Sequence, residues 1–482
     1  MGEDEMANVR LHNPFTQKLV FDEPSATFAD IKEKIGKAQS AYKAWRKVPA
    51  IQRAAMLRSA LDVMRHAQDN ISTAIANEMG KTKMAASQEM DFMLERANRM
   101  CTFVEDGALV DLDLSRYYDD TFEGTIRYQG KGVIYIISPW NYPLFTAING
   151  VICALLSGST VVLKHTTTPS VGRLFEKTFR NMGDHRDLLF NVTVDYDVSA
   201  EIIEKGDINH VVFTGSVQGG RVIQQSLAKR VMNETLPSPF IEASLELGSN
   251  DACYIAEDAD MEQALLWAVK IGRLHNSGQS CCAVKRVYVH RSLHDEFTRK
   301  AKAIMEKEIC GDPMDDATTL GPLFGGKRAV ELLLNMAVDA RDKGALIVTG
   351  GDTQTINGCE FLSPTLVCNV DHSMKIMREE TFGPVLPVQK VDDDAQAFEL
   401  MADTKYGLTA SIFTRSRKRV EKFVDALDFG TLFVNRCNFV DARLAWTGFR
   451  QSGNGSVALS PEGLRAFSKK KSLNVDGSML TT

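Results

Sequence analysis

An alternation of short apolar runs with helical stretches, which begins at Gly132, is the feature that most constrains the fold. Apolar strands that alternate with helices favour a parallel, doubly wound α/β sheet, because helices must cover both of its faces. Such sheets bind ligands beyond the carboxyl ends of their strands. The predicted strands are 133–137, 160–163, 188–192 and 210–213, with helices from about Leu144, after Pro169 and from Gly219.

A second lobe follows from the length of the chain and from its later pattern. A chain of 482 residues is too long for one ordinary hydrophobic core. Helical spacing of apolar residues covers 27–105, and a second α/β series is predicted to begin near Ser244. We therefore expect an α/β fold with two doubly wound, Rossmann-like lobes. The strands of the second series are predicted at 252–255, 286–290, 346–349, 385–390 and 410–414.

Two further segments predict a small β element outside these lobes. Residues 117–129 alternate charged, aromatic and β-branched side chains around Glu123-Gly124, which is typical of a β-hairpin. Near the end of the chain, a basic stretch at 469–471 leads into a predicted strand at 472–475. We expect this strand to pair with the hairpin or with a neighbouring subunit.

The charge and the cysteines exclude several classes of protein. A formal net charge of −6 without a long Lys/Arg block predicts no nucleic-acid partner and no binding to an anionic membrane. The first ten residues carry acidic groups where a targeting leader needs basic ones, and no apolar stretch is long enough to span a membrane. Nine scattered cysteines suit a reducing compartment better than a disulfide framework. We predict a cytoplasmic protein with small-molecule ligands and no metal site.

The first of four chemical motifs is the small, polar turn 276–282, which contains Cys281 and Cys282 and precedes a predicted strand. A thiolate nucleophile needs an accessible, partly polar setting of this kind. Structural cysteines in a turn would produce the same local pattern, and for this motif alone they are the more frequent explanation.

The second motif is 244–248, in which Glu246 stands between two leucines at the boundary of the lobes. Apolar neighbours raise the pKa of a carboxyl group, and a raised pKa suits a general base that activates water. A strand with one solvated face would also explain this motif.

The third and fourth motifs follow predicted strands. In 138–143 two prolines fix the backbone around Asn141, so its amide is held where it could donate to a developing oxyanion, although a simple turn bounded by prolines explains the residues equally well. In 213–220 glycines between a strand and a helix would let a cofactor pyrophosphate approach backbone N–H groups. Glycine-rich turns are common, so this fourth motif is only moderately specific.

Taken together and in this order, the four motifs resemble the aldehyde dehydrogenase superfamily, and the resemblance extends from about Leu11 to Val475. Further matches are Lys164 within 161–170, the stretch 379–384 and the late stretch 448–455. The resemblance implies NAD(P)-dependent oxidation of an aldehyde to a carboxylic acid. It also implies a cofactor-binding domain (1–116 and 132–243), a catalytic domain (244–456) and an oligomerisation or bridging element (117–131 and 457–482).

The resemblance assigns a role to each motif residue. Cys281 would be the nucleophile that forms a thiohemiacetal and then a thioester, Glu246 the base, and Asn141 with the Cys281 backbone N–H the oxyanion hole. Lys164 would hold the adenosine ribose, Ser216 the pyrophosphate and Glu380 the nicotinamide ribose, with Phe382 near the nicotinamide. The remaining predicted cofactor contacts are Trp140, Thr167 and Gly215, and the predicted substrate pocket consists of Tyr142, His275 and Trp446.

Several departures from the family pattern carry further predictions. Ser249 and Asn250 stand where Gly-Lys is usual, and the stretch from Ser216 to Glu246 is longer than usual, so a surface insertion is expected at 236–239. Gly219, where an aliphatic side chain often covers the adenine, is expected to loosen cofactor binding. Thr167, where NAD-selective members often carry Glu, would tolerate a 2′-phosphate, so we expect NADP to be accepted as well as NAD, with a preference for NADP left open.

The substrate is the least constrained part of the prediction. Asn149 and His275 stand where succinate-semialdehyde dehydrogenases carry arginines, which favours a neutral aliphatic or aromatic aldehyde over a carboxylated one. The alternatives are a succinate-semialdehyde-type enzyme, an acylating member that uses coenzyme A, and an inactive structural member of the fold. The resemblance also implies a homodimer or homotetramer.

Overall fold

The computed structural model describes residues 8–118 and 122–480. Its first sheet is fully parallel and has the strand order β7-β6-β5-β8-β9, the arrangement of a Rossmann fold with the first strand in the middle. The strand ends that face a ligand in such folds are therefore those of β5, β6 and β8. The strands are β5 (Val133–Ile137), β6 (Thr160–Lys164), β7 (Leu189–Val192), β8 (His210–Thr214) and β9 (Glu242–Glu246).

The second sheet has seven strands in the order β12-β15-β16-β11-β10-β18-β19, parallel except for the edge pair β12–β15. The prediction of an α/β fold with two doubly wound lobes is confirmed by these two sheets. The strands are β10 (Ala252–Ile255), β11 (Arg286–His290), β12 (Leu346–Thr349), β15 (Thr365–Cys368), β16 (Val385–Val391), β18 (Thr409–Phe413) and β19 (Thr431–Val434).

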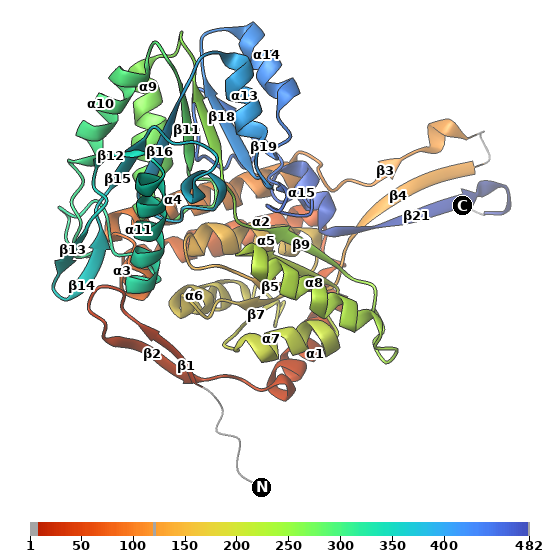
Figure 1. Ribbon diagram of the computed structural model, residues 1–482. Coiled ribbons are helices and arrows are strands. Elements are labelled where there is room, and N and C mark those ends of the chain that lie inside the picture. The colour runs from red at the N-terminus through yellow and green to blue at the C-terminus, as the bar shows by residue number, and fades with distance from the viewer. Residues whose placement is uncertain (1–7, 119–121, 481–482) are drawn as a thin grey trace.

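Helices cover both sheets, as the sequence pattern requires (Figure 1). The first lobe uses α1 (Phe28–Trp45), α2 (Ala50–Arg65), α3 (Gln68–Met79), α4 (Lys83–Glu105), α5 (Pro143–Ser157), α6 (Pro169–Phe179), α7 (Tyr196–Lys205) and α8 (Val217–Val231). The second lobe uses α9 (Met261–Leu265), α10 (His294–Met305), α11 (Gly326–Asp342), α12 (Lys375–Arg378), α13 (Asp394–Ala402) and α14 (Arg417–Ala426). None of the described helices is long and apolar enough to span a bilayer.

Helix α5 connects this packing to the site. It is apolar around its whole circumference and almost entirely buried, with Pro143 in its first turn and Gly158 at φ 90° after its end. Its own N-cap residue makes no capping hydrogen bond, and instead the carboxylate of Glu89, on α4, accepts hydrogen bonds from the backbone N–H groups of Leu144 (2.9 Å) and Phe145 (3.0 Å). Helices α4 and α5 are thereby locked together beside the loop that follows β5.

The predicted hairpin at 117–129 is wrong. β4 (Phe122–Gly130) runs straight through Glu123-Gly124 and pairs antiparallel with β21 (Ser468–Asp476) on one side and with β3 (Leu112–Asp113) on the other. Gly124 lies within the strand and not in a turn. It packs closely against Tyr118, because a Cβ at this position would lie 2.5 Å from the ring. The pairing of the C-terminal strand with this region agrees with the expectation, and the three-stranded sheet projects from the body of the molecule (Figure 1).

Two other predictions shift in detail. The second α/β series was expected from Ser244, but β9 belongs to the first sheet, so a boundary at 243 cuts a strand. The segment between α8 and β9 lies at the surface, as expected for an insertion at 236–239. It is nevertheless anchored, because the fully buried Arg230 donates hydrogen bonds to the carbonyl of Ser238 and to three carbonyls around the end of α7.

Candidate active site

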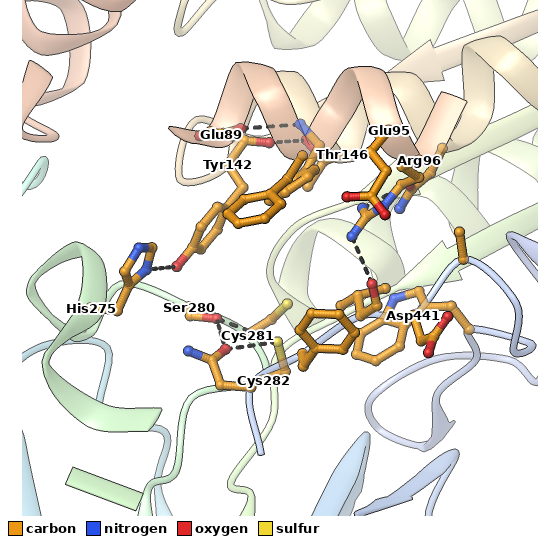
Figure 2. Close-up of a pocket in the computed structure, with 18 of the residues that line it drawn as sticks. Glu89, Glu95, Arg96, Tyr142, Thr146, His275, Ser280, Cys281, Cys282 and Asp441 are labelled. Carbon is orange, nitrogen blue, oxygen red and sulfur yellow. Dashed lines mark hydrogen bonds between the residues drawn. The ribbon is translucent and has the colours of Figure 1, made fainter. Parts of the chain in front are cut away.

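A cavity of about 510 Å³ lies where α4, α5 and loops of the second lobe meet. A volume of this size suits a small-molecule ligand. Cys281, Glu246 and Tyr142, from three of the four motifs, line it together with His275 and Trp446. Figure 2 shows Cys281, Tyr142 and His275 around this space.

The loop that carries the cysteines is held in a strained conformation. It follows the π-helix η2 (Leu266–Leu274), and Asn276 and Ser277 both have a φ of 54° in the left-handed region, which costs about 1 kcal/mol or more for each residue. The fully buried Arg273 compensates, because its guanidinium donates to the carbonyls of Gly278 (2.6 Å) and Val284 (3.1 Å). The loop therefore holds its backbone rigidly before any ligand binds.

Both adjacent thiols line the cavity, and Cys281 is the more exposed of the two. Cys281 is only partly buried, whereas Cys282 is buried and donates a hydrogen bond to Oδ1 of Asn438 at 3.1 Å. The hydrogen bond with the neighbouring thiol and burial raise the pKa of Cys281 above its usual value, and the charge of Lys285 opposes this effect. A nucleophile in this setting needs a base to remove its proton.

Glu246 supplies such a base at the carboxyl end of β9. Burial raises the pKa of Glu246 to about 7, as the apolar neighbours predicted, while the hydrogen bond from Nε1 of Trp446 to Oε2 (3.1 Å) partly offsets the rise. A carboxyl group with this pKa can gain and lose a proton near neutral pH.

Asn141 lies against the cysteine loop, although it does not line the cavity wall. Its side-chain nitrogen donates to the carbonyl of Gln279 at 3.1 Å, and its own carbonyl accepts from the side chain of Asn276 at 2.9 Å. One N–H of its amide thus remains for another acceptor. Its part in an oxyanion hole stays a prediction.

Lys285 is a candidate functional residue that sequence reasoning missed. Its side chain is completely buried, and its ammonium donates to Oγ of Ser249 (2.8 Å) and to the carbonyls of Ser280 (2.9 Å) and Cys281. It also lies 3.3 Å from the carboxylate of Glu380. Lys285 therefore joins the backbone of the nucleophile to the carboxylate predicted to hold the nicotinamide ribose. Its position four residues after Cys281 could have drawn attention to it.

The residues predicted to hold the adenosine half of a cofactor lie around β6 and β8. Lys164 is buried, its ammonium donates to the carbonyl of Asp195 (3.2 Å), and burial lowers its pKa to about 8. Its ammonium also lies 4.8 Å from the ring centre of Tyr196, and with one hydrogen bond among the described residues it has donors left for ribose hydroxyls. Ser216 caps α8 by accepting from the backbone of Gly219, and Thr167 is half-buried after β6.

Gly215 and Gly219 flank the ring of Phe213. A Cβ would lie 2.6 Å from the ring at the first glycine and 2.5 Å at the second. A side chain at Gly219 would therefore require the ring of Phe213 to move, which is a reason for glycine that the sequence did not provide. A glycine-lined helix N-terminus of this kind fits a pyrophosphate.

The nicotinamide half would meet Glu380, Phe382 and Trp140. Glu380 accepts from the backbone N–H of Ser249 at 3.0 Å and approaches Gly248 so closely that a Cβ there would lie 2.3 Å from Oε2. The rings of Phe382 and Trp140 meet edge to face at 5.6 Å. The residues present thus fit a dinucleotide at both of its ends.

The predicted substrate wall is partly organised by buried charges. The hydroxyl of Tyr142 and Nδ1 of His275 are 2.7 Å apart, and burial lowers the pKa of His275 to about 4, so its imidazole is neutral at pH 7. Lys81, which is ion-paired with Glu89, lies over the ring of Tyr142 at 4.0 Å. Trp446 also lines the cavity, where its indole N–H donates to Glu246.

Arg96 is the second residue that sequence reasoning missed. It lines the same cavity from α4 and is 8% exposed. The signal lay in helical spacing, because Met93, Arg96 and Met100 follow the buried stripe of α4 and a charged residue in such a stripe needs a reason.

Comparisons with known proteins agree with this geometry. The model of the family described as "Aldehyde dehydrogenase family" matches residues 2–473. The chain is 31% identical to the succinate-semialdehyde dehydrogenase [NADP(+)] of Deinococcus radiodurans, over 95% of this chain and 93% of that protein. It is 32% identical to a benzaldehyde dehydrogenase of Bacillus subtilis, over 92% and 89%. The solved structure of lactaldehyde dehydrogenase from Escherichia coli aligns with a TM-score of 0.90 at 29% identity, over 98% and 97%.

Proposed function

Because this chain belongs to the aldehyde dehydrogenase family and is an NAD(P)-dependent oxidoreductase acting on aldehydes, we propose that Cys281 is its nucleophile and Glu246 its base. The observation that carries this proposal is the presence of both groups in one cavity, where burial raises the pKa of Glu246 to about 7. A carboxylate poised at this pH can take the proton of a thiol whose own pKa is raised.

The residues of this chain account for the remaining steps. Sγ of Cys281 attacks the carbonyl carbon while Glu246 takes its proton, and the backbone N–H of Cys281 with the Asn141 amide stabilises the oxygen of the thiohemiacetal. The bound nicotinamide cofactor supplies the hydride acceptor for the oxidation of this adduct to a thioester. Glu246 loses its first proton to solvent, then takes a proton from the water that attacks the thioester and passes it to the departing sulfur of Cys281, which releases the acid and restores the thiol.

Lys164, Ser216 and Glu380 would hold the cofactor, with Gly215, Thr167, Trp140 and Phe382 around it. NADP-dependent relatives support the prediction that NADP is accepted, since the Deinococcus radiodurans protein carries NADP(+) in its name. A succinic semialdehyde dehydrogenase from Streptococcus pyogenes, solved with NADP⁺, aligns at 26% identity with a TM-score of 0.88 over 97% of this chain and 99% of that one. Comparison of kcat/KM for NADP and NAD tests the prediction, and strong selectivity for NAD would contradict it.

The reaction itself is tested by an aldehyde screen read through NADH or NADPH absorbance, with Cys281→Ser as the inactive reference. Turnover that requires coenzyme A would favour the acylating alternative, and aldehyde oxidation that survives the Cys281→Ser exchange would overturn the proposed nucleophile. The aromatic walls formed by Tyr142 and Trp446 support an aliphatic or aromatic body for the substrate. Neutrality of the whole substrate stays a prediction.

The assignment of domains along the chain is likewise a proposal. Residues 1–116 and 132–243, extended to the end of β9, would bind the cofactor, and the rest up to 456 would carry the chemistry. The segments 117–131 and 457–482 would join subunits into a dimer or tetramer, since their strands β4 and β21 belong to the projecting sheet, which offers edges for pairing. The free cysteines support a cytoplasmic location. Sedimentation of the protein tests the assembly, and a monomer would contradict it.

A further inference from the structure

Arg96 is a buried cation in the wall of the cavity whose hydrogen-bond partners are all neutral. Nη1 donates to Oδ1 of Asn149 (3.1 Å) and Nη2 to the carbonyl of Val440 (3.0 Å), while the guanidinium lies 4.1 Å from the ring centre of Phe145. Within residues 8–118 and 122–480 no carboxylate forms an ion pair with it. Burying a charge without an ion-pair partner costs folding free energy. An anionic ligand bound to Arg96 would offset this cost.

The guanidinium keeps both its charge and free donors. Burial lowers the pKa of Arg96 to about 10, which still leaves it protonated at pH 7. A guanidinium has five N–H donors, and the two hydrogen bonds above use two of them. The side chain of Arg96 points from α4 into the cavity, and Cys281 and Cys282 line the same cavity from another side (Figure 2).

Three of the four acidic residues that line the cavity are ion-paired or solvated, and the fourth is the proposed base Glu246. Asp441 is ion-paired with Arg443 at 2.6 Å, and Glu89 is ion-paired with the buried Lys81. Glu95 is exposed to solvent, where its charge is screened. Arg96 is thus a buried cation of the cavity without an ion-pair partner among the described residues, and the nearby acidic groups, Glu246 among them, act on its charge only through space.

We propose that Arg96 binds an anionic group at the end of the substrate remote from the reacting carbonyl, so that short aldehydes ending in a carboxylate or a phosphate are preferred. Arginine suits this task because its planar fork can donate two parallel hydrogen bonds to such oxyanions. The inference rests on the proposed function, since it places the aldehyde carbon at Cys281. It competes with the prediction of a neutral substrate, which considered only Asn149 and His275. In the structure Asn149 is the residue that holds Arg96.

The first test changes the substrate and leaves the protein intact. Succinic semialdehyde is compared with its methyl ester, which has the same chain without the charge, and glyceraldehyde 3-phosphate serves as the phosphate arm. We expect kcat/KM for one of the two anions to exceed that for the ester by about 100-fold. Equal values for anion and ester would overturn the inference and leave the proposed function standing. If the enzyme oxidised none of a broad aldehyde panel, the proposed function itself would fail.

The second test changes the protein. In Arg96→Met the ratio of kcat/KM for the preferred anion to that for the ester should fall by about 30- to 100-fold, whereas Arg96→Lys should keep part of the preference. Arg99→Met is the matched control, because Arg99 lines the same cavity from α4 but is exposed, and a small, salt-dependent decrease is expected. Binding of succinate to the cofactor-free protein, measured by calorimetry, should be lost in Arg96→Met. An unchanged ratio with unchanged succinate binding would refute the role of Arg96.

Discussion

The two sides of the catalytic cavity are built in opposite ways. The nucleophile side, formed by Glu246 and residues 276–285, comes mostly from one contiguous loop that buried hydrogen bonds hold rigid. The arginine side, formed by Arg96, Asn149 and Val440, joins residues up to 344 positions apart in the sequence. If the proposed roles hold, the chemistry depends mostly on one short loop and the base on β9, whereas selectivity depends on a tertiary contact between distant elements.

The largest effect should come from breaking the nucleophile side. Cys281→Ser should lower kcat/KM by about 1,000-fold or more for every aldehyde, because a hydroxyl is a much weaker nucleophile than a thiolate. Cys282→Ser is the matched control and should retain most activity, since a serine can still donate to Asn438. Steady-state kinetics with a charged and an uncharged aldehyde separate this uniform loss from the selective loss expected at Arg96. If Cys282→Ser inactivated the enzyme and Cys281→Ser did not, Cys282 would be the nucleophile.

Glu246→Gln should have the next largest effect, a decrease of about 100- to 1,000-fold in turnover. Because burial raises the pKa of Glu246 to about 7, its carboxylate form prevails only above that pH. The rate at which iodoacetamide alkylates Cys281 should therefore increase as the pH passes 7, and this increase should disappear in the variant. Glu242→Gln, on the same strand but 81% exposed at its side chain, is the control. A pH profile that the Glu246 exchange leaves unaltered would exclude it as the base.

Lys285→Met tests whether the rigidity of the nucleophile side depends on a buried cation. We expect kcat/KM to fall by about 10- to 100-fold, because the carbonyls of Ser280 and Cys281 lose a charged donor. Since the charge of Lys285 lowers the pKa of Cys281, alkylation of the cofactor-free protein should also shift to higher pH, an effect that mere loss of packing would not produce. Lys327→Met, at a side chain that is 72% exposed, should change neither quantity. If the Lys285→Met variant were alkylated with the same pH profile as the wild type, Lys285 would have only a structural role.

The contrast between the two sides also explains what the sequence could predict. The apolar runs of β5, β10 and β11 are predicted with their bounds intact, because strands buried on both faces leave continuous apolar segments. The raised pKa of Glu246 follows in the same way from its leucine neighbours. Glu123-Gly124 misled the prediction because a glycine needed for a close contact looks the same as one needed for a turn.

Arg96 and Lys285 were missed for a different reason, because their local signals, the helical spacing of α4 and the nearness to Cys281, do not identify the groups that they contact. No short-range rule tells a buried arginine on an amphipathic helix from one at its solvated edge, and the partner of Arg96 becomes apparent only when α4 packs against α5. Lys285 likewise gains its meaning from Ser249 and Glu380, which come from distant segments. Local propensity can place the elements, whereas the polar contacts between them require the tertiary structure.

The smallest predicted effect concerns Trp446, which belongs to the late segment of the chain and yet contacts the base on the nucleophile side. Its hydrogen bond to Oε2 of Glu246 lowers the pKa of that carboxyl group and so works against burial. Trp446→Phe removes this donor while keeping an aromatic wall, so the pKa should rise further and the alkylation profile should move to higher pH by less than about one pH unit. Because the base is then more protonated at pH 7, turnover at that pH should fall a few-fold and recover at pH 8. A shift toward lower pH would mean that Trp446 acts on Glu246 by excluding water and not through its hydrogen bond.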